Sequence, residues 1–299
     1  MKFVTAKTGS DKPFIGLVIE KTILHIQKAE FSLTGESWVP DSLVEAIDMG
    51  ELFISRIKEI VQHIPSLQEH FFYELDSVQL LSPIPKPRKN IICVGKNYAD
   101  HAIEMGSAAD IPEDIIIFTK APTTVIGHKG IVLNHSGITN QLDYEGELAI
   151  VIGKEGIGIP EDRAKEYIFG YTILNDITAR DLQAKHKQFF LGKSLDTTCP
   201  IGPWIVHSSH IEDPNNLHIA TWINGEKRQD SNTQNCIFSI EKIISILSRG
   251  MTLQPGDIIA TGTPAGVGKG FKPPKFLKPG DIMEVTVEGI GTLRNKIEG

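Results

Sequence analysis

The sequence predicts a predominantly β, α+β fold in two domains, and three observations support that prediction. Short apolar runs of the kind that form strands outnumber the segments with helical periodicity. The two kinds of segment do not alternate regularly, which disfavours a Rossmann or TIM-barrel architecture. The stretch LSPIPKPRKN (81–90) carries prolines at alternate positions, which excludes helix and favours an extended connector. We therefore expect a small amino-terminal α+β domain over 1–82 and a larger domain over 83–299.

The sequence predicts the following helices and strands, in chain order for the amino-terminal part and by type after it. The apolar runs FIGLVIE (14–20) and TILHI (22–26) are split by a charged turn, which predicts a hairpin, and helical patterns follow around 41–64. One helix is expected after Asp176, with Thr178 as N-cap and Asp181 at N3, running through 179–189. Another is expected over 240–250, with Gly250 as its C-cap. Strands are expected at 90–95, 115–120, 146–153, 169–176, 201–207, 217–225, 256–262 and 282–293.

Composition narrows the functional class. The 299 residues are 40% hydrophobic and 22% charged, which is ordinary for a globular protein. The net charge of −7 and the lack of a basic run argue against nucleic acid or an anionic membrane as partner. No apolar run approaches the roughly 20 residues that span a bilayer, so no membrane insertion is expected. The three distant cysteines fit neither a disulfide framework nor a zinc knuckle, so we expect a cytoplasmic protein with reduced thiols.

Two acidic residues in QLDYEGELAI (141–150) set the main question about function. Glu145 and Glu147 are two apart in a strand-like segment, so their side chains point the same way. Either the pair lies on a solvated strand face, or a cation lies between them. Asp176, at the end of another expected strand, would complete a set of three oxygen ligands of the kind that selects Mg²⁺ or Mn²⁺ over zinc. A plain helix-capping role for Asp176 remains the alternative at this stage.

Several motifs occur in the order found in one enzyme family. They are CVGKNYADHAIEMG (93–106), DYEGELAIVIGK (143–154), GYTILNDITARDLQ (170–183), GKSLDTTCPIGPWIV (192–206), NGEKRQ (224–229) and GDIIATGTPAGVG (256–268). Together they cover most of 90–299 and resemble the fumarylacetoacetate hydrolase family, most closely its bacterial YisK-like oxaloacetate decarboxylase and acylpyruvase relatives. The resemblance implies a mixed β-sandwich roll, a homodimer, and Mg²⁺ or Mn²⁺ held by Glu145, Glu147 and Asp176.

The segment that contains NYADHAIEM supplies a candidate general base. His101 and Glu104 are three apart and share one face of a helical turn. A carboxylate beside an imidazole orients the ring and fixes its tautomer, as a general base requires. A surface helix pair is the alternative. The resemblance implies that this dyad lies on a segment that closes over the site.

Three further side chains are assigned to the site through the resemblance. Lys193 would bring positive charge to a developing enolate, and its alternative is an exposed turn lysine. Arg180 and Gln183 share a helix face and would contact substrate oxygens. For these two the alternative is a solvated helix flank.

The glycine-rich stretch TGTPAGVGKG (261–270) lacks the spacing of a phosphate-binding loop. As a turn it could offer backbone N–H groups and the Thr263 hydroxyl to a substrate carboxylate. His128 and His186 are expected at the surface or in turns. Cys199 has no evident base and is expected to be structural.

A small 2-oxo acid suits this set of residues, because the metal would stabilise an enolate at C2–C3. Loss of CO₂ from that intermediate is oxaloacetate decarboxylation, and attack of water on a C4 acyl group is acylpyruvate hydrolysis. The resemblance favours an oxaloacetate decarboxylase with accompanying acylpyruvate hydrolase activity. An isomerase or hydratase of unsaturated 2-oxo diacids, similar to 5-carboxymethyl-2-hydroxymuconate isomerase, is the second enzyme hypothesis. A non-enzymatic binding or scaffold protein is the third, disfavoured because the ligands, the dyad and the lysine are all present.

Overall fold

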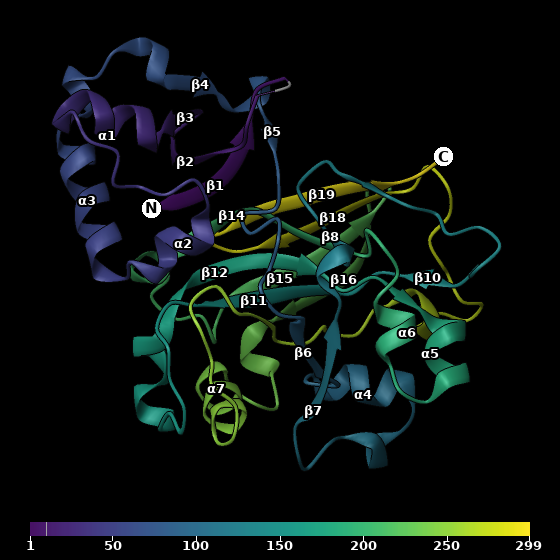
Figure 1. Ribbon diagram of the computed structural model, residues 1–299. Coiled ribbons are helices and arrows are strands. Elements are labelled where there is room, and N and C mark those ends of the chain that lie inside the picture. The colour runs from purple at the N-terminus through teal and green to yellow at the C-terminus, as the bar shows by residue number, and fades with distance from the viewer. Residues whose placement is uncertain (10) are drawn as a thin grey trace.

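The computed structural model describes residues 1–9 and 11–299 and is built around two β-sheets (Figure 1). The larger sheet has the strand order β4-β3-β2-β1-β14-β12-β11-β17-β6-β7, with β5 paired to β1 and β8 to β14. Its strands are β1 (Lys2–Lys7), β2 (Phe14–Ile19), β3 (Thr22–His25), β4 (Phe72–Glu74), β5 (Gln79–Leu80), β6 (Ile91–Gly95), β7 (Ile116–Lys120), β8 (Val125–Ile126), β11 (Gly146–Ile152), β12 (Ile168–Asn175), β14 (Cys199–His207) and β17 (Ile258–Ala260).

The smaller sheet has the order β16-β15-β18-β19-β9, and β10 pairs separately with β13. These strands are β9 (Ile131–Val132), β10 (Leu142–Asp143), β13 (Thr178–Ala179), β15 (His218–Ile223), β16 (Glu226–Asn232), β18 (Ile282–Val287) and β19 (Gly291–Ile297). The helices are α1 (Ile26–Thr34), α2 (Leu43–Asp48), α3 (Glu51–Gln62), α4 (Ala99–Met105), α5 (Arg180–His186), α6 (Phe190–Lys193) and α7 (Ile240–Ser248). The fold is thus the mixed, strand-rich α+β architecture that the sequence predicts.

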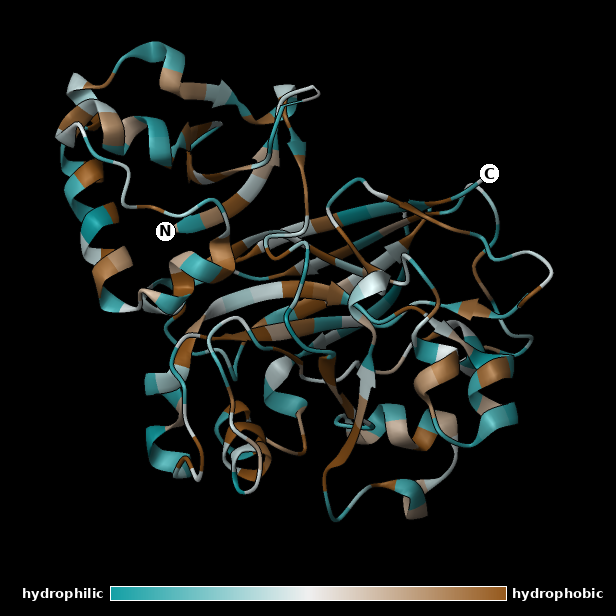
Figure 2. Cartoon of the chain, viewed as in Figure 1, coloured by the Kyte–Doolittle hydropathy of each residue, from teal (hydrophilic) through white to brown (hydrophobic). Residues whose placement is uncertain are grey.

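The two sheets pack face to face through a shared apolar core. Leu148 and Ile150 of β11 contribute to it together with Ile219 of β15 and Val285 of β18, and hydrophobic residues mark the central strands in Figure 2. The sheets lie close together at Gly146, where an added Cβ would lie 2.3 Å from the Thr221 hydroxyl oxygen. Glycine is therefore required directly between the two acidic residues of the motif.

The amino-terminal segment extends the large sheet. β1 pairs antiparallel with β14, with Phe3 opposite Ile205. A second core joins Phe3 and Phe53 of this segment to Ala149 of β11 on the other face of the large sheet. The division at 82/83 into two domains remains a prediction, and the structure adds that one sheet and one core connect the two parts.

The predicted hairpin is β2–β3, and the predicted helical region is α2 followed by α3. Three predicted helix ends are wrong. Thr178 lies in β13 with its hydroxyl donating to the Asp176 carbonyl oxygen (2.9 Å), and α5 begins after Ala179 without a side-chain cap. The helix also ends at His186, because Lys187 turns to a positive φ of 59°. α7 ends at Ser248 with Arg249, not Gly250, as the C-cap.

No helix in the described ranges is both long and apolar enough to cross a membrane.

Candidate metal centre and its cavity

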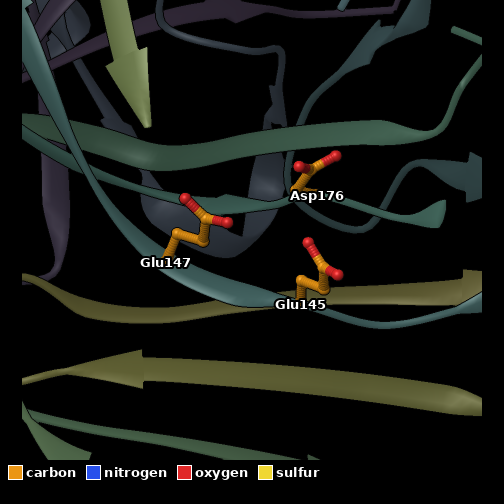
Figure 3. Close-up of side chains that lie close together, drawn as sticks. All are labelled: Glu145, Glu147 and Asp176. Atoms are coloured by element: carbon orange, nitrogen blue, oxygen red, sulfur yellow. The ribbon is translucent and has the colours of Figure 1, made fainter. Parts of the chain in front are cut away.

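Antiparallel pairing of β11 with β12 brings the three predicted carboxylates together. The Asp176 N–H donates to the Glu145 carbonyl oxygen (2.8 Å), and the Glu145 N–H donates to Asn175 Oδ1 (3.0 Å). Glu147 follows two residues later on β11, so its side chain leaves the strand on the same side as Glu145. Figure 3 shows the three carboxylates converging from the two segments.

The donor set fits a hard divalent cation. One oxygen from each of Glu145, Glu147 and Asp176 lies within 4.8 Å of the other two. The residues are only 4%, 1% and 0% exposed, so solvent does not screen the repulsion among their charges. Buried carboxylates this close to one another require positive charge nearby, and an all-oxygen set suits Mg²⁺ or Mn²⁺. The solvated strand face and the simple helix cap are both excluded by this burial and clustering.

Three buried cations surround two of the carboxylates. Lys193 Nζ lies 2.7 Å from both Glu145 Oε2 and Asp176 Oδ2, and Arg180 Nη1 lies 2.7 Å from Glu145 Oε1. Lys120 Nζ is 2.8 Å from Asp176 Oδ1, but its hydrogen bond is directed at the Ile177 carbonyl oxygen. Asp176 Oδ1 therefore has a charged neighbour and no directed donor among the described residues, as expected of an oxygen available to a metal.

The surrounding charges shift the pKa values of the two glutamates in opposite directions. Burial favours the neutral acid, but the charges of Lys193 and Arg180 outweigh it and lower the pKa of Glu145 to about 2. Burial, together with the negative charges of Asp176 and Glu145, raises the pKa of Glu147 well above its ordinary value. Burial opposes the charged form of Lys193, yet Asp176 and Glu145 raise the pKa of this lysine. Glu147 is thus the carboxylate whose charge the surrounding protein compensates least.

A cavity of about 200 Å³ opens beside the carboxylates. Seven of the nine predicted site residues line it: His101, Glu145, Glu147, Arg180, Gln183, Lys193 and Thr263. Lys193 is 1% exposed and Arg180 is 2% exposed, so neither the exposed turn lysine nor the solvated helix flank applies. Asp176 and Glu104 do not line the cavity, but Glu104 contacts His101, which does.

The predicted dyad forms on α4. His101 Nδ1 lies 3.4 Å from Glu104 Oε2, and His101 is buried, which excludes a surface pair. Glu104 Oε1 also accepts the Gly266 N–H (2.9 Å) from the glycine-rich loop. The carboxylate therefore orients the imidazole and fastens α4 to that loop. Cys199 is buried, and His186 is exposed on α5.

The Thr263 hydroxyl already has partners within the protein. It donates to the Gly146 carbonyl oxygen (3.0 Å) and accepts from Gln229 Nε2 (2.7 Å). A hydroxyl has one proton to donate, and Thr263 already donates it to Gly146. The predicted role of this hydroxyl toward a substrate carboxylate therefore stays a prediction. Gln229 Oε1 in turn accepts the Gly146 N–H (3.0 Å), so these bonds fix the backbone between the two glutamates.

Sequence reasoning missed four residues of the site. Lys120 and Gln229 support Asp176 and Gly146 from distant strands. Lys120 has no local signal in the sequence, whereas Gln229 is the last residue of the motif NGEKRQ. Asp143 is fully buried and binds Arg180 Nε (2.8 Å) and the Gly268 N–H (2.6 Å). Its position two residues before Glu145 was the available signal. Lys269 lines the cavity from the glycine-rich loop.

Comparison with known proteins agrees with this geometry. The family model described as "Fumarylacetoacetate (FAA) hydrolase C-terminal" matches residues 90–298. The chain is 54% identical to "Oxaloacetate tautomerase YisK" of Bacillus subtilis (strain 168), over 99% of this chain and 100% of that protein. A fumarylacetoacetate hydrolase structure from Exiguobacterium antarcticum aligns over 100% of both chains with 40% identity and a TM-score of 0.81. Maleylpyruvate hydrolase from Sphingobium sp. SYK-6, in complex with manganese(II) and pyruvate, aligns over 100% and 99% with 30% identity and a TM-score of 0.78.

Proposed function

From the premise that this chain belongs to the fumarylacetoacetate hydrolase family, we propose that it is a metal-dependent enzyme that interconverts the enol and keto forms of oxaloacetate. One observation carries the proposal: three buried carboxylates, a buried lysine and an oriented histidine meet at one small cavity. The full-length similarity to an oxaloacetate tautomerase supports the choice of reaction and substrate.

Glu145, Glu147 and Asp176 would hold the ion, for which we propose Mg²⁺ or Mn²⁺ because all three donors are carboxylate oxygens. Bound there, the ion would supply the positive charge that withdraws electrons from C2 of a 2-oxo acid and favours its enolate. The manganese and pyruvate in the maleylpyruvate hydrolase complex support this choice of metal and of ligand class.

Tautomerisation moves one proton and no other atom. In the enol-to-keto direction the oxygen on C2 loses a proton and C3 gains one. We assign the proton at C3 to His101, whose imidazole is oriented by Glu104 (3.4 Å). We assign to the Lys193 ammonium the compensation of the negative charge on the C2 oxygen. Arg180 and Gln183 would contact the remaining substrate oxygens from the wall of the cavity.

Oxaloacetate decarboxylation and acylpyruvate hydrolysis are further outcomes of the same enolate chemistry. The structural similarity to a maleylpyruvate hydrolase supports a C–C-cleaving activity. Decarboxylation removes CO₂ from C3 and needs no base there. Hydrolysis needs a water molecule activated by a base. The isomerase hypothesis remains the alternative, since structures titled as isomerases of unsaturated diacids also align over the whole chain.

The proposal is tested by following enol absorbance and pyruvate formation separately, with oxaloacetate, acetylpyruvate and an unsaturated 2-oxo diacid. We expect the enzyme to accelerate loss of the oxaloacetate enol band in the presence of Mg²⁺ or Mn²⁺, and the rate to fall to that of the uncatalysed reaction on addition of EDTA. Unchanged turnover in the metal-free protein would contradict the metal assignment. Metal-dependent turnover of the unsaturated diacid alone would favour the isomerase, and no turnover of any substrate would favour the binding protein.

Replacing the histidine separates the reactions. Because a general base typically contributes 10²- to 10⁴-fold, His101→Ala should slow tautomerisation and acetylpyruvate hydrolysis by roughly 10²-fold or more. Pyruvate formation from oxaloacetate should fall much less, since loss of CO₂ needs no base at C3. His186→Ala, on the exposed end of α5, is the matched control. Equal losses in all three reactions would mean that His101 serves binding or closure of α4.

We further propose that the protein acts as a homodimer, as the family resemblance implies, and that it lies in the cytoplasm, as its three distant cysteines indicate. A solution mass of about twice 32.9 kDa is then expected. A mass equal to that of one chain would contradict the dimer.

A further inference from the structure

A buried aspartate holds two cationic residues side by side at the cavity. Asp143 Oδ2 accepts both the Arg180 Nε–H (2.8 Å) and the Lys269 backbone N–H (3.0 Å). Asp143 Oδ1 accepts the Gly268 N–H (2.6 Å). One carboxylate thus fixes the glycine-rich loop against the guanidinium, and both Arg180 and Lys269 line the cavity.

Arg180 and Lys269 each keep an N–H group that pairs with no acidic side chain among the described residues. Arg180 uses Nε for Asp143 and Nη1 for Glu145, while its buried Nη2 has no hydrogen-bond partner in residues 1–9 and 11–299. Such an orphaned donor on a cavity wall indicates a ligand oxygen.

Lys269 is exposed while also lining the cavity, so it belongs to the rim. No acidic side chain in the described part of the chain pairs with its ammonium, whereas Lys96, another lysine of the lining, pairs with Asp110 (3.3 Å). Burial, and then repulsion from the charge of Arg180, lower the pKa of Lys269. An anion between them would remove that repulsion.

We propose that Arg180 and Lys269 bind the second carboxylate of the substrate, so that the site selects 2-oxo dicarboxylates over 2-oxo acids with an uncharged distal end. The inference rests on the proposed function for the 2-oxo end of the ligand. Lys269 is then a residue that determines specificity, and Asp143 is the residue that positions it. Oxaloacetate has the required second carboxylate, and acetylpyruvate, which ends in a methyl ketone, does not.

An unreactive ligand pair tests the subsite independently of turnover. Malate and 2-hydroxybutyrate share the 2-hydroxy acid end and differ in a distal carboxylate against a methyl group. Their affinities are measured by calorimetry in Mg²⁺ for the unmodified protein and for Lys269→Met, Lys269→Arg and Lys272→Met. Lys272 is an exposed lysine of the same loop that does not line the cavity, so it controls for net charge.

We expect the unmodified protein to prefer malate. Lys269→Met should weaken malate binding by roughly threefold to tenfold, as for a charge-assisted hydrogen bond at a partly exposed site. It should leave 2-hydroxybutyrate unaffected. Lys269→Arg should retain the preference, and Lys272→Met should behave like the unmodified protein.

Equal effects of Lys269→Met on both ligands, or no effect on either, would overturn the subsite. Oxaloacetate turnover is measured on the same preparations. If malate is preferred through Lys269 but no metal-dependent turnover occurs, the proposed reaction fails while the dicarboxylate subsite stands. If turnover is normal and malate is not preferred, the subsite fails while the proposed reaction stands.

Discussion

At the scale of residues, the site is a nearly balanced set of buried charges. Burying a lone charge costs several kcal/mol, so the carboxylates of the site need nearby cations or hydrogen-bond donors. Four carboxylates and three cations give a formal charge of −1, which a divalent ion would change to +1, a sign suited to an anionic substrate. The carboxylates are Asp143, Glu145, Glu147 and Asp176, and the cations are Lys120, Arg180 and Lys193.

Glu147 is the carboxylate that a metal should affect most. Its Oε2 accepts the Gly262 N–H (2.7 Å), and no cation pairs with it among the residues described here. Glu147→Gln keeps that acceptor and removes repulsion from Glu145 and Asp176, so the metal-free variant should be at least as stable as the unmodified protein. The stabilisation by Mg²⁺, about 2.7 kcal/mol at 100 times Kd, should disappear together with turnover.

Thermal unfolding with and without Mg²⁺ measures both effects of Glu147→Gln. The exposed Glu155 provides the matched control, and Glu155→Gln should retain the response to metal. A Glu147→Gln variant that Mg²⁺ still stabilises by the full amount would show that this carboxylate is not a ligand.

Lys193 should matter for stability as well as for reaction. Lys193→Met leaves Glu145 and Asp176 without the ammonium that lies 2.7 Å from both, and breaking a buried ion pair typically costs 3–5 kcal/mol. We therefore expect a loss of roughly that size in the metal-free protein, and a larger stabilisation by Mg²⁺ than in the unmodified protein. Denaturant unfolding measures it, with Lys185→Met on the exposed side of α5 as control. A variant as stable as the control would mean that Lys120 and Arg180 suffice.

At the scale of elements, the strands with apolar patterns could be predicted from the sequence. The polar strand that supports the site could not. The strand β11 could be predicted correctly because apolar residues occupy both of its faces: Leu148 and Ile150 face one core, and Ala149 and Val151 face the other. β16, with the sequence EKRQDSN, gives no apolar signal because it pairs at a sheet edge with mostly polar side chains, yet it supplies Gln229.

That Glu145 and Glu147 share one side could be predicted because strand alternation is a local property. The assignment of Asp176 to the set rests on the family resemblance, because its approach to the two glutamates depends on the pairing of β11 with β12. Lys120 could not be predicted, because its partner Asp176 is 56 residues away and only the sheet order brings them together. The N-cap prediction at Thr178 failed because the two-strand pairing of β10 with β13 takes that residue into a strand. Tertiary pairing thus overrides a local capping signal.

Of residues 99–113, only His101 and Ala102 are buried, so α4 and the segment that follows it bury little surface. Glu104 binds the Gly266 N–H, and the remaining ion pair, between Lys96 and Asp110 (3.3 Å), is exposed and therefore weak. The free protein should open this segment readily, because little surface is buried by it. Oxalate resembles the planar pyruvate enolate and, with Mg²⁺, should favour the closed segment.

Amide exchange over residues 99–113 should therefore slow by up to roughly 100-fold when oxalate and Mg²⁺ are present at 100 times Kd. Exchange in α1, which does not line the cavity, should not change. Slow exchange without ligand, or no response to oxalate, would show that α4 is pre-formed over the site and that His101 needs no closing step.

At the scale of the whole molecule, the amino-terminal segment is joined to the metal centre through the large sheet. β1 adds to β14, β14 pairs with β12, and β12 pairs with β11, which carries Glu147. The aromatic ring of Phe53 on α3 lies 5.2 Å from Phe3 and 6.5 Å from Phe169 of β12, between ring centroids. Because core packing and strand pairing cross the predicted domain boundary, the two parts should unfold together.

This expectation gives a test of the predicted division at 82/83. Phe53 is fully buried, so Phe53→Ala should cost about 3–5 kcal/mol. At roughly 2–4 °C per kcal/mol for a chain of this size class, the Tm should fall by about 6–20 °C. Calorimetry should show one transition that Phe53→Ala lowers and Mg²⁺ raises, whereas Leu52→Ala, on the exposed side of α3, should change little. Two transitions, the first lowered by Phe53→Ala and the second raised by Mg²⁺, would instead show that the segments are separate domains in spite of their shared sheet.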